Sequence, residues 1–174
     1  MSTMALGKGY DNQACAMARG LEIVGERWTL LIVRDAFYGV RRFSDFLAHL
    51  ELPRAVLSER LHVLTDAGIF AKQHPEGAMR AEYTLTDRGL ALWPVVASLS
   101  QWSAEHLRDG AKYLVYEHDP CGTEMPDRMN CPDCGSRVPL SEIAIAPGPA
   151  ADRERDDLVS LALTRRRLLL EPIR

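Results

Sequence analysis

Two short motifs near residue 120 have the residue types and spacing of metal ligands. His118 and Cys121 stand three positions apart in "HDPCG", and Cys131 and Cys134 repeat that spacing in "CPDCG". The glycine after each motif permits the tight turn in which backbone N–H groups point at thiolates. One imidazole and three thiolates fill the four tetrahedral positions of Zn²⁺ and leave none open for a substrate. The motifs therefore predict a structural zinc site, in which metal binding supplies folding energy that so short a segment lacks.

Other chemistry fits the same residues. His118 is the ligand most easily replaced, since Asp119, Asp127 or a water molecule could take its position. Cys131 and Cys134 could instead form an oxidisable dithiol, or the thiols could be inert. Thiol-disulfide oxidoreductases place such a pair at the start of a helix after a strand. The pair here lies in a glycine-flanked loop, so the zinc interpretation and the redox interpretation both stay open.

The composition is that of a globular protein without a membrane span. The 174 residues carry a net charge of −3, and 47% of them are hydrophobic. This charge gives no general argument for nucleic acid, but a local basic face decides such binding because charges beyond about 10 Å are screened. No apolar run approaches the roughly 20 residues that cross a bilayer, and "MSTMALGKGYDNQ" lacks the apolar core of a secretory signal. We therefore expect a cytoplasmic protein.

The first half of the chain shows helical periodicity interrupted by turn residues. Helices are expected at 14–24, at 27–38, from about Ser44 to residue 50, and from Pro53 to Gly68. Ser44 is the predicted N-cap of the third helix. In the fourth, Leu57, Leu61 and Leu64 are spaced to share one face. Two short helices joined by a tight turn, with the second one amphipathic, indicate a helix-turn-helix.

A β-hairpin and a long helix are expected next. "IFAKQHP" and "RAEYTLT", separated by the turn signal "EGA", predict a hairpin directly after the second helix of the motif, which is the position of a wing. A helix is predicted over 87–107, with Thr86 as its N-cap and a kink at Pro94. Beyond residue 110 we expect strands in "KYLVYEH" and "RVPLSEIAIA", and a final basic amphipathic helix in "LVSLALTRRRLLLEPIR".

The fold class that follows is mainly α with a small β-hairpin, a winged helix-turn-helix with a small α/β appendage. We divide the chain into a DNA-binding and dimerisation domain at 1–110, a cysteine-bearing module at 111–147, and a linker with a terminal helix at 148–174. The chain has no glycine-rich phosphate loop, nucleophile elbow or helical histidine pair with a glutamate, so we do not expect an enzyme.

Four short motifs in the first part of the chain are distinctive: the Gly25–Thr29 run, the Arg42–Phe43 pair, the Leu57–Leu61 run and the Tyr83–Thr86 run. In these motifs the helix-turn-helix segment resembles the HxlR family of bacterial transcription regulators. The resemblance covers about residues 12–108, and the cysteine-bearing tail resembles that of the longer members. It implies a winged-helix homodimer that acts as a repressor on an operator with two-fold symmetry. The chain departs from the family at Pro53, where serine is common, and at Ala55, where a basic residue is common.

The resemblance and the groove dimensions select candidate DNA contacts. A helix fits the major groove and reads base edges near its N-terminus. Base contacts are predicted for Arg54, Ala55, Val56, Ser58 and His62. Phosphate contacts, which position the protein without selecting sequence, are predicted for Arg42, Arg60, Lys72 and Arg80, and Ser58 suits a phosphate as well as a base. Ser44 and His74 are further predicted DNA contacts. The opposing interpretation is that Arg54 or Arg60 is solvated, or pairs with Glu59 or Asp66 within the protein.

The predicted partners besides double-stranded DNA are a second copy of the chain and a small-molecule or electrophile inducer. Trp93, Val96, Trp102 and His106 are expected to meet the partner chain, unless this stripe packs on the chain's own first helix and tail. Cys15 matches the position of a cysteine that senses oxidants in some HxlR-like proteins; alternatively it is a small buried residue at the dimer seam. A different class of function, a zinc-knuckle interaction adaptor or a thiol redox protein, is the alternative to a regulator.

Overall fold

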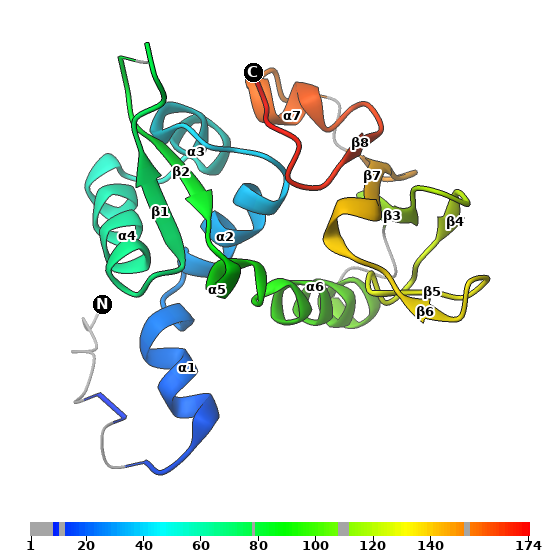
Figure 1. Cartoon of the computed structure of the whole chain (residues 1–174), viewed down its shortest axis with the longest axis horizontal. Helices are drawn as coiled ribbons and strands as arrows, with labels where there is room; N and C mark the ends of the chain where they lie inside the picture. Colours follow the sequence, from blue (N-terminus) through cyan, green and yellow to red (C-terminus); the bar gives the residue numbers. More distant parts are fainter. Residues whose placement is uncertain (1–8, 11–12, 78, 108–111, 152–153) are drawn as a thin grey trace.

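The structure is a computed structural model that describes residues 9–10, 13–77, 79–107, 112–151 and 154–174 (Figure 1). Four helices open the chain, followed by a hairpin, two further helices and a small sheet. The bounds of the first four helices are α1 Ala16–Val24, α2 Thr29–Phe37, α3 Phe43–Leu50 and α4 Arg54–Asp66. In Figure 1, α1 extends away from the other helices, with Ile23 and Val24 at its end packed against the core, whereas α2, α3 and α4 pack together.

The helix-turn-helix consists of α3 and α4. Glu51 ends α3 in the left-handed conformation with φ 52°, and Pro53 is the N-cap of α4. The predicted N-cap Ser44 is wrong, because α3 begins at Phe43 and Arg42 takes the cap position. The extended backbone of Arg42 bridges to Glu82 in the hairpin, which fixes the start of the helix earlier than Ser44.

One face of α4 is anchored in the core. Leu57, Leu61 and Leu64 are 0%, 1% and 0% exposed, which confirms the predicted apolar seam. Gly68, with φ 69°, follows the end of this helix as expected. Since three leucines hold one side, the opposite side of α4 is left on the surface.

The hairpin pairs β1 (Phe70–Gln73) with β2 (Glu82–Leu85). The strands are antiparallel, from Phe70 opposite Leu85 to Gln73 opposite Glu82. Figure 1 shows the hairpin beside α4, with its tip extending beyond the helices. This is the geometry of a wing, and the predicted winged helix-turn-helix is correct.

The predicted continuous helix over 87–107 is wrong. The chain forms a short helix α5 (Asp87–Leu90) and then α6 (Trp93–Leu107). Thr86 does cap α5, since its hydroxyl accepts a hydrogen bond from the Gly89 N–H at 3.2 Å. Pro94 lies in the first turn of α6, where the absence of an N–H leaves no helical hydrogen bond unmade. It therefore marks a new helix start and not a kink.

The C-terminal part forms an antiparallel sheet in the order β4-β3-β7-β8. The bounds are β3 Leu114–His118, β4 Thr123–Glu124, β7 Ile143–Pro147 and β8 Arg167–Leu168. Between them lie a hairpin of β5 and β6, a 3-10 turn η1 and a helix α7, with bounds β5 Asn130–Cys131, β6 Ser136–Arg137, η1 Leu140–Glu142 and α7 Leu158–Ala162. The two strands predicted from sequence correspond to β3 and β7.

The expected final helix is wrong beyond Ala162. Only α7 is helical, and the basic run continues into β8, which pairs with β7. Leu169 is 3% exposed, and its N–H donates to Ile143 O at 2.9 Å. The sheet edge therefore supplies hydrogen bonds and apolar contacts that a surface helix would not give this segment.

The end of the chain returns to the winged helix. The Leu170 N–H donates to Phe37 O at 2.7 Å, and the Ile173 N–H donates to Gly39 O at 3.0 Å. A Cβ at Gly39, where φ is 97°, would lie 1.8 Å from Glu171 O, so this approach requires glycine. One hydrophobic core includes residues from both parts of the chain. The division at 1–110, 111–147 and 148–174 stays a prediction.

Candidate nucleic-acid interface and candidate metal centre

The outer face of α4 carries the predicted base-reading residues. Arg54, Ala55, Ser58 and His62 are exposed, and Val56 is packed against the core. The Arg54 guanidinium lies 5.1 Å from the centre of the Phe43 ring. Within the described part of the chain, Arg54 has no ion pair with a carboxylate. Its charge is therefore available to an external ligand.

The predicted phosphate contacts lie on the neighbouring elements. Lys72 is exposed, with its Nζ 5.8 Å from the centre of the Tyr83 ring, and His74 and Arg80 lie exposed near the wing tip. Arg42 is exposed at the start of α3 and lies 3.7 Å from a carboxylate oxygen of Glu82. The helix start and the wing thus add cationic groups on two sides of α4.

Ser44, Arg60 and His62 have protein partners. The exposed Ser44 hydroxyl donates to Asp45 Oδ1 at 2.9 Å. The Arg60 side chain is 15% exposed and lies within 4.0 Å of carboxylate oxygens of both Glu59 and Glu26. His62 lies 3.3 Å from Asp66 one turn later.

Because Arg60 is both covered and paired, it is less accessible to DNA than the exposed Arg54 and Ser58. The pairing with Glu59 is one of the alternatives that the sequence left open. The pairing of His62 is different in kind, since His62 is 74% exposed and can turn away from Asp66.

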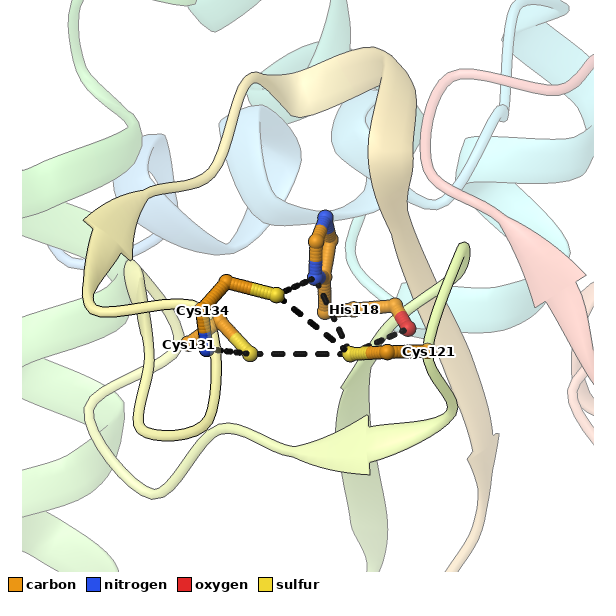
Figure 2. A group of neighbouring side chains, drawn as sticks. All are labelled: His118, Cys121, Cys131 and Cys134. Atoms are coloured by element: carbon orange, nitrogen blue, oxygen red, sulfur yellow. Dashed lines mark hydrogen bonds between the residues drawn. The ribbon is translucent and has the colours of Figure 1, made fainter.

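The four predicted metal ligands meet at one point (Figure 2). One ligand atom from each of His118, Cys121, Cys131 and Cys134 lies within 4.8 Å of the others. The Sγ of Cys121 lies 3.6 Å from that of Cys131 and 3.9 Å from that of Cys134. His118 Nδ1 lies 3.1 Å from Cys121 Sγ and 3.4 Å from Cys134 Sγ.

These separations are those of a tetrahedral zinc site. With Zn–S near 2.3 Å and Zn–N near 2.0–2.1 Å, tetrahedral angles place sulfurs about 3.8 Å apart and nitrogen about 3.6 Å from sulfur. A disulfide would bring two sulfurs to about 2.05 Å. All four cysteines are free. The residues therefore fit a closed, structural metal site.

Crowding of three thiols and an imidazole perturbs their protonation. Hydrogen bonding with the Thr123 side chain and backbone lowers the pKa of Cys121 to about 6, whereas hydrogen bonding with Cys131 and Cys121 raises the pKa of Cys134 to about 11. Burial opposes protonation of His118, but its hydrogen bonds to Glu142 and the thiols raise its pKa to about 9. The cluster therefore retains protons at neutral pH, and a divalent cation would displace them.

Two residues of this centre were missed by the sequence analysis. Glu142 Oε2 lies 3.2 Å from His118 Nε2, on the side of the ring opposite the sulfurs. Such a carboxylate fixes the orientation of a ligating imidazole. The Thr123 hydroxyl lies 3.3 Å from Cys121 Sγ and donates to Asp133 Oδ2 at 2.6 Å. No spacing rule indicates Glu142, because it reaches the site only through the pairing of β3 with β7.

Cys15 lies far from this cluster in sequence, at the N-cap position of α1. Its side chain is exposed in the single chain. The Arg19 N–H donates to the Cys15 carbonyl at 3.1 Å, an ordinary helical hydrogen bond. Neither the sensor role nor burial at a dimer seam is tested by this geometry, and both stay predictions.

Two of the four expected dimer residues belong to the chain's own core. Trp93 and Val96 are 4% and 5% exposed, so the expectation that they meet a partner is wrong. The Trp93 ring packs against Phe37 and Tyr116 at centroid distances of 5.0 and 5.8 Å. Trp102 is exposed, as is His106, and their rings lie 5.6 Å apart. The outer side of α6 is the part of this helix that remains available for association.

Comparison with known proteins identifies the class of the chain. Residues 23–111 match the family model described as HxlR-like helix-turn-helix. An uncharacterized HTH-type transcriptional regulator of Mycobacterium tuberculosis is 39% identical over 151 residues, covering 86% of this chain and 94% of the relative. The uncharacterized HTH-type transcriptional regulator YvaP of Bacillus subtilis is 40% identical over 89 residues, covering 50% and 82%.

A solved structure supports the same class. The crystal structure of PA1607, described as a candidate transcription factor, aligns with a TM-score of 0.63 and 30% identity, covering 86% of this chain and all of that one. The chain belongs to the HxlR-like helix-turn-helix family. It is a DNA-binding transcriptional regulator, a class that is not enzymatic. None of the described helices is both long and apolar enough to cross a membrane.

Proposed function

We propose that the protein is a homodimeric repressor that reads a palindromic operator with α4 and holds the DNA backbone with the wing and the start of α3. The observation that carries the proposal is the two-sided character of α4. Its leucine side is buried, and Arg54, Ala55 and Ser58 face outward at the end that enters a major groove. Lys72 and Arg80 on the wing add phosphate contacts beside it.

Exposed apolar side chains on two helices support a dimer. In α1, Ala18 is the only buried residue, while Met17 and Leu21 are 74% and 42% exposed. In α6, Val95 and Trp102 are 45% and 51% exposed. Burial of these side chains between two copies would give a dimer that carries two α4 helices. A spacing of about 34 Å would then match successive major grooves.

Selection of duplexes from a random pool tests this function. The expected product is a sequence of two inverted half-sites whose centres are about 10 base pairs apart. Repression follows physically when a dimer on a promoter excludes polymerase. In vitro transcription from a promoter that contains the selected sequence should fall as protein is added. Recovery of no enriched sequence, or a rise in transcription, would contradict the proposal.

We also propose that His118, Cys121, Cys131 and Cys134 hold a structural zinc ion, because their separations match a tetrahedral site. Metal analysis of protein purified without chelator or added zinc should give one Zn²⁺ per chain. Cys131→Ser should abolish zinc binding, whereas the matched variant Cys15→Ser, outside the cluster, should retain it. Metal-free protein that gains a Cys131–Cys134 disulfide on mild oxidation would favour the redox alternative.

A further inference from the structure

A cavity of about 770 Å³ lies between the winged helix and the C-terminal sheet, separate from the DNA face and the metal centre. Its walls come from α2, from one side of α6, from β3 and from the segment around α7. Pockets that bind small organic molecules have volumes of about 300–1,000 Å³. In α6 the lining residues include Leu99 and Ser103, whereas Trp102 of the proposed dimer face is not among them.

One region of the lining is apolar. Trp28 and Leu31 contribute to it from the start of α2, Leu99 from α6 and Leu163 from the end of α7. Leu99 is 47% exposed, and the other three side chains are partly covered. A ligand with an apolar body would remove this surface from water, which favours binding in proportion to the area covered.

The polar part of the lining holds a buried pair of phenols. Tyr38 and Tyr116 are 6% and 5% exposed, and their hydroxyl oxygens lie 3.0 Å apart. The pair has two O–H protons, and their mutual hydrogen bond uses one. Among the described residues, neither hydroxyl has another hydrogen-bond partner. Since a buried donor without an acceptor is costly, the second proton is suited to an acceptor within the cavity.

The charged groups of the described lining are all basic. They are Arg34, Lys112, Arg128 and Arg155, with His49 as a further titratable group. Three of the four form ion pairs within the protein. Arg34 pairs with Asp35, Lys112 with Glu124, and Arg155 with Glu51 and Asp157.

Arg128 differs from the other three. Its guanidinium lies 4.8 Å from the centre of the Tyr116 ring, and its Nη1 donates to Ala97 O at 3.0 Å. Within the described part of the chain it has no carboxylate in ion-pair distance. The cavity therefore places one uncompensated guanidinium beside the phenol pair. A carboxylate accepts hydrogen bonds from both kinds of donor.

We propose that this cavity binds an amphipathic organic anion, a carboxylic acid with an aromatic or aliphatic body, whose carboxylate lies on Arg128 and the Tyr38–Tyr116 hydroxyls. The further step, that occupancy alters DNA binding, rests on the proposed regulatory function. Arg128 provides the connection, because its carbonyl accepts from Trp93 Nε1 at 3.0 Å and its guanidinium holds Ala97 O. Both partners are in α6, so a ligand on Arg128 acts on a helix that is proposed to form part of the dimer contact.

Calorimetry on the full chain tests binding without DNA. The probes are 4-phenylbutanoate and decanoate, with neutral 4-phenylbutanamide as the matched control. Because hydrogen bonds to a charged group are strong, the acid should bind about tenfold or more tightly than the amide. Arg128→Gln should weaken binding of the acid at least about tenfold, and Tyr116→Phe should weaken it about threefold or more. Arg137→Gln, on β6 away from the cavity, should not change it.

Several outcomes would overturn the assignment. These are no heat of binding at millimolar probe, equal affinity for acid and amide, or equal affinity of the Arg128→Gln and Arg137→Gln variants. If the second copy of the chain filled the cavity, no heat of binding would be seen. Thermal melts of each variant establish that it is folded. Failure of the ligand-free protein to bind DNA would refute the proposed function. Calorimetry would still show whether the cavity binds the carboxylate probes, because that measurement does not use DNA. Ligand binding that leaves DNA affinity unchanged would refute the effector role.

Discussion

Replacement of Arg54 by alanine separates base reading from folding. The side chain is exposed and makes one stacking contact, with Phe43 at 5.1 Å. An exposed contact of this kind contributes about 0.5–1 kcal/mol, so the free energy of unfolding should change by no more than that. A bidentate arginine–guanine contact contributes about 1–3 kcal/mol of discrimination. In a dimer the substitution removes this interaction from both half-sites.

The expected loss of operator affinity is therefore about 2–6 kcal/mol, which is about 30-fold or more. Fluorescence anisotropy with the selected operator and with a random duplex, at several salt concentrations, measures it. Affinity for the random duplex should fall much less, because phosphate contacts carry non-specific binding. The matched control is Arg137→Ala, an exposed arginine on β6 in the C-terminal module.

Equal loss of affinity for the operator and the random duplex would show that Arg54 contacts phosphate and not a base. Equal behaviour of the Arg54→Ala and Arg137→Ala variants would refute the placement of α4 in the groove. A large loss of stability would show that the Arg54 side chain holds α3 against α4, and the reasoning from its exposure would then be wrong.

Three further changes test other parts of the account. Leu61→Ala, at a site 1% exposed, should lower the free energy of unfolding by about 2–5 kcal/mol in urea titrations, whereas Ser58→Ala on the exposed side of the same helix should change it by less than about 0.5 kcal/mol. Lys72→Ala should weaken binding of the operator and the random duplex equally. The slope of log affinity against log salt concentration should become flatter by about 0.9 for each phosphate that is no longer neutralised. A selective effect on the operator would contradict a phosphate role. Burial raises the pKa of Asp157, but hydrogen bonds from Ser160 and His49 lower it more, so the folded state holds the charged form. Asp157→Asn should therefore be less stable than the natural chain at pH 7, and the difference should shrink as the pH falls below about 4; a difference independent of pH would contradict this.

The winged helix was predictable because its signals are local. The spacing of Leu57, Leu61 and Leu64 defines the buried side of α4, and the β-forming runs around residues 70–73 and 82–85 define the wing. The cluster of one histidine and three cysteines was also predictable, since each pair of residues is close in sequence and each is followed by a glycine. These patterns depend on neighbours within a few residues.

The errors arise where distant segments decide the local structure. Ser44 is a good cap by type, but the bridge from Arg42 to the wing fixes the helix start. The run at 163–174 has helical composition, yet the edge of β7 draws residues 167–168 into the sheet. Trp93 has the pattern of a surface stripe, but its ring is buried against Phe37 of α2 and Tyr116 of the C-terminal sheet. No periodicity within a single element carries this information.

Methylation interference on the selected operator tests the central claim most directly, since N7 of guanine lies in the major groove. If α4 enters that groove, methylation should block binding at two clusters of guanines about 10 base pairs apart, and Arg54→Ala should remove the block at one guanine in each cluster. Binding that is insensitive to guanine N7 methylation, or interference unchanged by Arg54→Ala, would contradict the claim that this face of α4 reads DNA.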